Sequence, residues 1–421
     1  MQKQIKNYIE KYLSPFLCGY RKGFNAQYAL IAMIEKWKQT SDNGGFSSAI
    51  LTDLSKAFDT INHELLLAKL AAYGFKEQSL NILWSYLTKR FQRTRINFAF
   101  STWQELLSGV PQGSVLGPLL FNIYLNDIFF VIQKTYVCNF ADDTTLTSTC
   151  DQLNSVFRNL DHDIRSAIVW FDDNYMKLNK DKCKLFVSGN LHEHHFIKLD
   201  DELIWENSFI KLLGITIDKS LKFDLHLGNV CKKSSRKVTA LARVAKFLPF
   251  YKKKLLFNSF IESQFSYCPL VWMFCARKLN AKINHIHERA LRIIYNDYTS
   301  SFENLLRSDK SLTVHQRNIQ LVAIEMFKVK KGLNPKIIQD LFRENPFREN
   351  TFQRPRVHYE RGKNSLSVFG PIVWNTMLPE HIKKCESLVD FKKSIKTWIP
   401  NNCVCKLCKT YIQGLGYIRV S

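Results

Sequence analysis

Aspartates at the ends of apolar segments are the residues of this sequence best suited to catalysis. Asp53 follows the apolar segment 49–52, and Asp142 and Asp143 follow the segment 137–140. A charge at the end of a buried strand is costly unless it is paired or binds a metal ion. If the two segments are neighbouring strands, the carboxylates converge and can hold two Mg²⁺ ions about 3.5–4 Å apart, the clamp used for in-line phosphoryl transfer. The alternative interpretation is turn chemistry, because Asp favours turns.

The elements that position these aspartates alternate between strand-like and helix-like patterns. The patterns predict strands over 46–54, 91–100, 135–140, 144–149, 183–187 and 209–217. They predict helices over 5–17, 26–38, 56–73, 80–88 and 151–175, an apolar helix from residue 118, and mostly helices over 222–345. Asp142 and Asp143 then lie at the tip of a hairpin. Residues 346–366 are polar and Arg-rich, which indicates a linker or arm.

Composition and charge divide the chain into two halves. The 421 residues carry a net charge of +23, with 46% hydrophobic residues, which excludes a disordered tail or a coiled-coil rod. Residues 1–220 hold 24 Lys and Arg against 23 Asp and Glu, whereas residues 221–421 hold 36 against 14. The basic half favours a polyanionic partner, a nucleic acid or an anionic membrane, although each basic cluster alone is also explained as a solvated helix face.

Two further features bear on the compartment. No run of about 20 apolar residues and no signal peptide is present in the sequence. The 11 cysteines have no disulfide-framework spacing, which favours reduced thiols. We therefore expect a protein of the nucleus, the cytoplasm or both, with no membrane partner.

Five short motifs follow one another along the chain. They are Asp53-Leu-Ser-Lys-Ala-Phe58-Asp59, Ser108-Gly-Val-Pro-Gln112-Gly113-Ser114, Phe140-Ala-Asp142-Asp143, Leu178-Asn-Lys-Asp-Lys182-Cys183 and Leu213-Gly214-Ile215. This constellation resembles the reverse transcriptase domain of non-long-terminal-repeat (LINE-type) retrotransposons. The resemblance covers about residues 13–220 and extends more loosely to the end of the chain.

The resemblance implies an α+β fold of the right-hand polymerase type. It implies an antiparallel palm sheet backed by helices, with fingers, a thumb and a helical, basic C-terminal region. The implied domains are 1–48 (partial fingers), 49–190 (palm with a fingers insertion), 191–221 (primer-grip hairpin region), 222–300 (helical thumb) and 301–421 (basic region with a Cys-rich tail). Because few residues precede Asp53, we also expect an N-terminally truncated copy without the family's endonuclease domain.

The resemblance assigns roles in catalysis and nucleotide selection. Asp53 and Asp142 are implied to be the metal-binding aspartates, with Asp143 as a supporting carboxylate. Phe58 is implied to lie under the incoming sugar, where its ring excludes a 2′-hydroxyl; the alternative is an ordinary core phenylalanine. Gln112 is implied to hydrogen-bond near the nucleotide.

Further implied roles concern the nucleotide and primer. Gly113 is implied to let the backbone approach the template–nucleotide pair. Arg21 is implied to grip the triphosphate and Lys182 to protonate the leaving pyrophosphate, each with a solvated cation as the alternative. Leu213, Gly214 and Ile215 are implied to form the primer grip.

The implied function is RNA-directed DNA polymerisation, a nucleotidyltransferase reaction. The implied partners are an RNA template, a DNA primer and deoxynucleotides, and the implied cofactors are two Mg²⁺ ions, for which Mn²⁺ can substitute. An inactive nucleic-acid-binding remnant is the alternative. An RNA-directed RNA polymerase is disfavoured by Phe58.

The Cys-rich tail offers a possible second metal site. Cys403, Cys405 and Cys408, with Cys385 upstream, could form a degenerate zinc knuckle. No histidine follows them, so a fourth ligand is not evident and free thiols are the favoured interpretation. The sequence alone does not decide whether this tail binds zinc.

Overall fold

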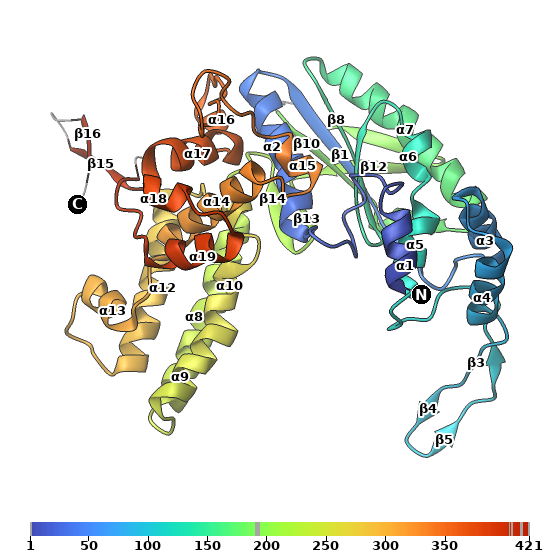
Figure 1. The fold of residues 1–421 in the computed structure, drawn as a ribbon, viewed down its shortest axis with the longest axis horizontal. Coiled ribbons are helices and arrows are strands. Elements are labelled where there is room, and N and C mark those ends of the chain that lie inside the picture. The colour runs from blue at the N-terminus through green and yellow to red at the C-terminus, as the bar shows by residue number, and fades with distance from the viewer. Residues whose placement is uncertain (1, 190–193, 404, 406, 413–415, 420–421) are drawn as a thin grey trace. The chain divides into compact units, whose positions relative to one another are not determined.

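The computed structural model describes residues 2–189, 194–403, 405, 407–412 and 416–419 (Figure 1). The chain forms two compact units: unit 1 is Met1–Ala29 with Gly44–Asn207, and unit 2 is Leu30–Asn43 with Ser208–Ser421. Among the helices of the described residues, none is both long enough and apolar enough to span a bilayer.

Unit 1 is built on a six-stranded sheet with the order β11-β12-β10-β1-β8-β7. Its strands are β1 (Phe46–Thr52), β7 (Tyr136–Phe140), β8 (Asp143–Cys150), β10 (Lys184–Ser188), β11 (Phe196–Leu199) and β12 (Glu202–Asn207). The pairs on both sides of β1 are antiparallel, as expected, whereas β10 and β12 pair in parallel over two residues. Most residues of β1 are buried, because helices cover the sheet and leave little of its central strand in contact with water.

The helices of unit 1 are amphipathic or wholly apolar and bury their apolar faces with the sheet in one core. They are α1 (Gln2–Ile9), α3 (His63–Ala72), α4 (Glu77–Leu87), α5 (Gly117–Leu125), α6 (Ile128–Val131) and α7 (Leu153–Asp173). Helix α7 packs on β8 and β1. All residues of α5 apart from Pro118 are buried, which confirms the buried apolar helix expected from Pro118 onward.

Three local predictions for unit 1 are wrong. The helix predicted over 5–17 is α1, which ends at Ile9. The helix predicted over 56–73 begins only at His63, because Lys56 has a φ of 53° and Asn62 caps the helix by accepting a hydrogen bond from the Leu65 N–H at 2.9 Å. The predicted strand 91–100 is instead a hairpin arm. It consists of β3 (Phe91–Gln92), β4 (Arg95–Ile96), β5 (Ala99–Phe100) and β6 (Gln104–Glu105). The alternating pattern predicted one continuous strand, but Asn97, with a φ of 55°, reverses the chain within this segment.

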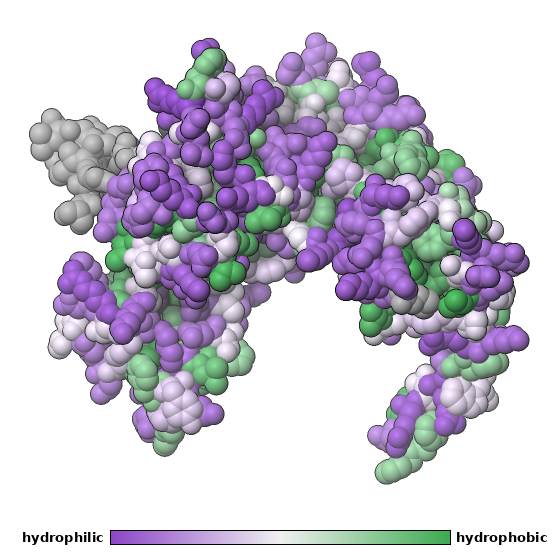
Figure 2. All heavy atoms as spheres, in the orientation of Figure 1, coloured by the Kyte–Doolittle hydropathy of each residue, from purple (hydrophilic) through white to green (hydrophobic). Residues whose placement is uncertain are grey.

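The hairpin arm exposes aromatic rings beside arginines. Phe98 is 92% exposed, and the Arg93 guanidinium lies 4.0 Å from the centre of the Phe100 ring and 4.6 Å from that of Trp103. Hydrophobic and hydrophilic residues alternate along the arm in Figure 2. A small pair, β2 (Leu54–Ser55) with β9 (Lys177–Leu178), completes the strands of this unit.

Unit 2 is mainly helical. Two long helices, α8 (Asp224–Ala245) and α12 (Arg277–Tyr295), pack against each other, and α14 (Val314–Lys330) packs on α19 (Leu388–Thr397) and α17 (Leu366–Ile372). The shorter helices are α9 (Phe250–Leu256), α10 (Ser263–Ser266), α11 (Pro269–Trp272), α13 (Phe302–Asp309), α15 (Lys336–Gln339), α16 (Glu360–Lys363) and α18 (Glu380–Lys383). Two hairpins, β13 (Phe209–Leu212) with β14 (Ile215–Asp218) and β15 (Lys409–Ile412) with β16 (Gly416–Arg419), complete the unit.

Helix α2 (Ala26–Asp42) contributes buried charges to unit 2 from its second turn onward. The Glu35 carboxylate accepts hydrogen bonds from the N–H groups of Leu366 and Ser367 at 2.7 and 2.9 Å, at the N-terminus of α17. Asp42 accepts from two further backbone N–H groups in 358–359, each at 2.7 Å. Residues 30–43 therefore associate with the C-terminal half of the chain, although they lie inside the 1–48 segment predicted as partial fingers. The predicted domain ranges remain predictions.

Candidate active site

The register of the sheet brings the three predicted aspartates to one end of β1. Phe140 pairs with Asp143 across the β7–β8 hairpin, so Ala141 and Asp142 form its two-residue turn. Thr52 pairs with Thr144, and continuing this antiparallel register by one residue places Asp53 opposite Asp143. The strand beside β1 is β8, which begins at Asp143, and not β7, which precedes the aspartate pair. The hairpin therefore places Asp142 and Asp143 at the same end of the sheet as Asp53.

Electrostatics shows that negative charge accumulates at this end of the sheet. Partial burial raises the pKa of Asp143, and the neighbouring charges of Asp142 and Asp53 raise it further. The Lys182 ammonium lies 3.0 Å from Asp53 Oδ2. Carboxylate oxygens are the ligands that hard divalent cations prefer, so the donor set fits such ions. The oxygens of the three aspartates do not all lie within 4.8 Å of one another, and Asp53 is paired with Lys182.

An aromatic pair lies beside the carboxylates. The ring of Phe58 stacks on Phe121 with a centroid distance of 4.3 Å, and the ring of Tyr20 meets Phe58 edge-on at 5.9 Å. The pKa of Tyr20 is raised by partial burial and by the negative charge of Asp142. Phe58 is half-buried, neither wholly in the core nor free in solvent. The sequence analysis did not single out Tyr20, which lies outside the five motifs.

The 108–114 loop packs on the segment that carries Phe58. Backbone N–H groups of Gly109 and Val110 donate to the carbonyls of Ile61 and Phe58 at 2.8 and 2.9 Å. A Cβ on Gly109 would lie 2.8 Å from the Asp59 backbone, so glycine is required there. These contacts bring two of the motifs together.

The predicted nucleotide residues of this loop lie at its exposed end. Gln112 Nε2 donates to Asp59 Oδ1 at 2.9 Å. Gly113 has a φ of 77° and open space where a Cβ would stand. The positive φ therefore favours glycine at 113, whereas no neighbouring atom of the protein excludes a side chain there.

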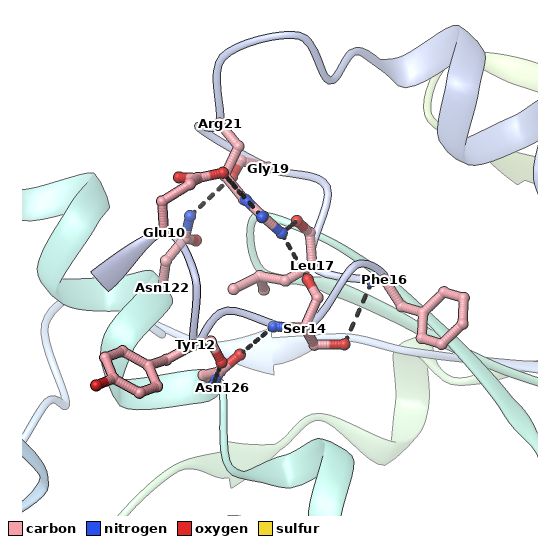
Figure 3. Close-up of polar contacts among 9 residues, drawn as sticks. All are labelled: Glu10, Tyr12, Ser14, Phe16, Leu17, Gly19, Arg21, Asn122 and Asn126. Carbon is pink, nitrogen blue, oxygen red and sulfur yellow. Dashed lines mark hydrogen bonds and ion pairs between the residues drawn. The ribbon is translucent and has the colours of Figure 1, made fainter. Parts of the chain in front are cut away.

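Arg21 lies in a buried network, where neither of the two predicted interpretations had placed it (Figure 3). Its guanidinium donates to Glu10 Oε1 at 2.8 and 3.0 Å and to the carbonyls of Ser14 and Leu17 at 2.5 and 3.0 Å. Its side chain is only 7% exposed, so it is not a solvated loop charge. In this conformation its donors are directed into the protein and not toward a nucleotide. Arg21 holds together the segment that precedes Tyr20.

The segment around Arg21 also supports the hairpin that carries Asp142 and Asp143. The N–H of Cys18 donates to the Asn139 carbonyl at 2.8 Å. Asn122 Nδ2 donates to the Gly19 carbonyl at 2.8 Å, a contact drawn in Figure 3. A Cβ on Gly19 would lie 2.3 Å from the backbone nitrogen of Ala141, so only glycine allows this approach. The Gly19 contact therefore fixes the turn that presents Asp142.

The predicted primer-grip residues form the turn of the β13–β14 hairpin in unit 2. Leu213 and Gly214 have φ values of 46° and 80°, and Ile215 begins β14. The Tyr267 hydroxyl donates to the Leu213 carbonyl at 2.7 Å, and its ring lies 3.2 Å from where a Gly214 Cβ would stand. Tyr267, which the sequence analysis did not single out, thus fixes the hairpin tip. Because Tyr267 lies far from Leu213 along the chain, no local sequence pattern predicts their contact.

In unit 1, the end of the sheet that carries the three aspartates lies in the same unit as the packed 53–59 and 108–114 motifs. Residues 1–217 match the family described as reverse transcriptase (RNA-dependent DNA polymerase), and the chain belongs to this family. The match covers all of unit 1, and in unit 2 it covers Leu30–Asn43 and extends into the β13–β14 hairpin. The predicted family and the mixed α+β fold are thereby confirmed.

Similar proteins include polymerases of insect transposons. The chain is 25% identical over 289 residues to the probable RNA-directed DNA polymerase from transposon BS of Drosophila melanogaster, covering 66% of this chain and 32% of that protein. It is 25% identical over 242 residues to the RNA-directed DNA polymerase from mobile element jockey of the same organism, covering 56% and 26%. The chain thus spans a third or less of the length of these relatives.

Among solved structures, apo telomerase from Candida tropicalis aligns with 79% of this chain and 58% of its own chain. The sequence identity is 11% and the TM-score is 0.39. A likeness this weak carries no argument about function.

Proposed function

We propose that this chain is an RNA-directed DNA polymerase that adds deoxynucleotides to the 3′-hydroxyl of a DNA primer on an RNA template. The observation that carries the proposal is the meeting of Asp53, Asp142 and Asp143 at one end of the sheet in a chain of the reverse transcriptase family. Asp53 and Asp142 would hold two Mg²⁺ ions, and Asp143 would support them. When bound, such ions activate the primer hydroxyl and neutralise the triphosphate.

The other residues of the site select and orient the nucleotide. Phe58, held by its stack on Phe121, is positioned under the sugar, where its ring excludes a 2′-hydroxyl. Gln112 is oriented by Asp59, and Gly113 leaves room for the template–nucleotide pair. Lys182, whose side chain is 65% exposed, is free to turn from Asp53 toward the leaving pyrophosphate and to donate a proton there. Lys182 is also the cation that pairs with Asp53 before metal binding.

The basic second half of the chain is proposed to bind the nucleic acid. Residues 221–421 carry 36 Lys and Arg against 14 Asp and Glu, which suits contacts to phosphates that require charge and little sequence readout. The Leu213–Ile215 turn, fixed by Tyr267, is proposed to contact the primer.

The test is primer extension by the purified chain on poly-rA with oligo-dT, dTTP and Mg²⁺ or Mn²⁺. We expect incorporation by the wild type and none by Asp142→Asn. The matched control is Asp173→Asn, which removes an exposed carboxylate at the end of α7 and should leave incorporation unchanged. Wild-type incorporation no higher than that of Asp142→Asn would instead support the inactive nucleic-acid-binding remnant.

A further inference from the structure

A buried cluster of soft metal ligands lies in unit 2, within the C-terminal half of the chain. Among the described residues, one group of three or more His, Cys, Asp or Glu has all its ligand atoms within 4.8 Å of one another: His315, Cys403, Cys405 and Cys408. His315 and Cys403 are buried, and the other two are half-buried. From these residues we propose a structural zinc site of the Cys₃His type.

The spacing of the ligand atoms matches a tetrahedral zinc ion. With Zn–S of about 2.3 Å and Zn–N of about 2.0–2.1 Å, tetrahedral angles require S···S of about 3.8 Å and S···N of about 3.6 Å. The Cys405 and Cys408 sulfurs are 3.8 Å apart, and His315 Nε2 lies 3.3 Å from the Cys405 sulfur and 3.8 Å from that of Cys403. Four ligands without an open position are typical of structural sites.

The fourth ligand comes from a helix far upstream. His315 lies in the first turn of α14, where Thr313 and Gln316 form a capping box that fixes the start of the helix. Its Nδ1 is buried without a hydrogen-bond partner in the described part of the chain, so Nε2 is the nitrogen that faces the thiols. The fourth candidate ligand was not evident in the sequence, because His315 lies far from the cysteines along the chain. The other predicted ligand, Cys385, lies outside the cluster, with its sulfur 3.7 Å from Ser394 Oγ.

The protein holds the cysteine segment against α14 independently of any metal. Gln320 Nε2, on α14, donates to the carbonyls of Ile395 and Trp398 at the end of α19, each at 2.7 Å. The rings of Phe327 and Phe391 stack between the same two helices at 4.2 Å. Four residues after the Gln320 contacts, Asn402 Nδ2 donates to the Met377 carbonyl at 3.3 Å, and Cys403 follows. The ligands are thus brought together by the packing of long helices, and the site is largely preformed.

A zinc ion here would join residue 315 covalently to residues 403–408. Such a link closes a loop of nearly ninety residues, which restricts the unfolded chain and stabilises the folded unit. Because β15 begins at Lys409, next to Cys408, the ion would also fix the start of the terminal hairpin.

The experiment measures metal bound to the purified full chain, a readout that is independent of polymerase activity. We expect about one zinc per chain by elemental analysis for the wild type and loss of that zinc in His315→Ala. His315→Cys should retain the zinc as a Cys₄ site. The matched control, Cys385→Ser, removes a thiol of the same unit that lies outside the cluster and should also retain it.

Replacement of zinc by Co²⁺ identifies the ligands spectroscopically. The wild type should show the visible bands of tetrahedral Co²⁺ with thiolate charge transfer, and the charge transfer should intensify in His315→Cys. A wild type that neither contains zinc nor binds added Zn²⁺ or Co²⁺ would overturn the proposal. So would zinc that is unchanged in His315→Ala, or a mass showing a Cys405–Cys408 disulfide.

Discussion

Unit 1 gathers three aspartates at the end of a sheet, whereas unit 2 gathers three cysteines and a histidine between helices. The aspartates are oxygen donors, and Asp142 and Asp143 are exposed, so ions bound there can exchange and a substrate can approach. The cysteine and histidine ligand atoms lie within 4.8 Å of one another and are buried or half-buried, which suits a permanent structural ion. The proposed sites would thus be one catalytic and one structural arrangement of metal ligands in the same chain.

The two clusters also differ in how the chain assembles them. The aspartates lie at one end of the sheet because the register of β1, β8 and β7 places their backbone positions there. His315 meets the cysteines because α14 and α19 pack together through Gln320 and through the Phe327–Phe391 stack. The first assembly depends on backbone pairing and the second on side-chain packing, so they should respond to different perturbations.

The largest expected effect separates the two clusters by activity. Asp142→Asn should lower dTTP incorporation by about 10³-fold or more, because a metal ligand is replaced by a neutral amide. The same preparation should retain its zinc, because the Cys/His cluster contains no aspartate. Incorporation and zinc content are measured on one sample. Loss of both together would show that the variant is misfolded and that the two clusters are not independent.

The second effect concerns stability. A zinc-selective chelator, added in excess Mg²⁺, should lower the melting temperature of the wild type by about 10 °C, because a structural ion contributes to folding free energy. Thermal unfolding followed by circular dichroism measures the shift. His315→Ala should melt near the chelated wild type and be insensitive to chelator. If the zinc-loaded and the chelated wild type had the same melting temperature, the ion would have no structural role.

Sequence analysis succeeded where the deciding interactions are local or follow from strand pairing. Asp142 lies in the hairpin turn, Asp143 begins β8, and Asp53 directly follows the strand that pairs with β8, so motif and periodicity were sufficient to predict their position at one end of the sheet. Their role in catalysis stays a prediction. The helix predicted from Lys56 failed because a positive φ at that residue prevents it, and no propensity indicated this conformation.

Contacts at longer range were not predicted, and for a common reason. The bonds of Arg21 to Glu10 and to two backbone carbonyls were not foreseen, and its role toward the triphosphate stays a prediction. His315 lies 88 residues before Cys403, and only helix packing brings them together. Side-chain contacts between distant helices leave no periodic pattern in one sequence, whereas paired strands do.

The third effect tests the aromatic pair beside the carboxylates. Phe58→Val should reduce discrimination against ribonucleotides by about 10–100-fold, because the ring that occupies the space of a 2′-hydroxyl is lost. The ratio of kcat/KM for dTTP and UTP measures this change. Phe98→Val, on the exposed arm, is the matched control and should leave the ratio unchanged. Unchanged sugar selection in Phe58→Val would remove Phe58 from the nucleotide site and leave it as a packing residue on Phe121.

The smallest expected effect is a pH dependence at the aspartates. The pKa of Asp143 is raised by partial burial and by Asp142 and Asp53, so the folded state binds its proton more tightly than the unfolded state does. The contribution of Asp143 to the free energy of unfolding is therefore fully present below the ordinary Asp pKa of about 3.9. It is lost as the pH rises through the raised pKa, because the folded state must then carry an unfavourable charge. Asp143→Asn cannot acquire the charge and avoids this loss.

Without divalent cations, Asp143→Asn should thus melt about 1–2 °C above the wild type at pH 7 and at the same temperature near pH 3.5. The gain is small because Asp143 is exposed and water screens the repulsion. Addition of Mg²⁺ should reverse the order at pH 7, since the cation binds the carboxylates that destabilise the free protein. A gain that persists unchanged in Mg²⁺ would mean that the aspartate cluster does not bind the ion, whereas the zinc site of unit 2 would be unaffected by that result.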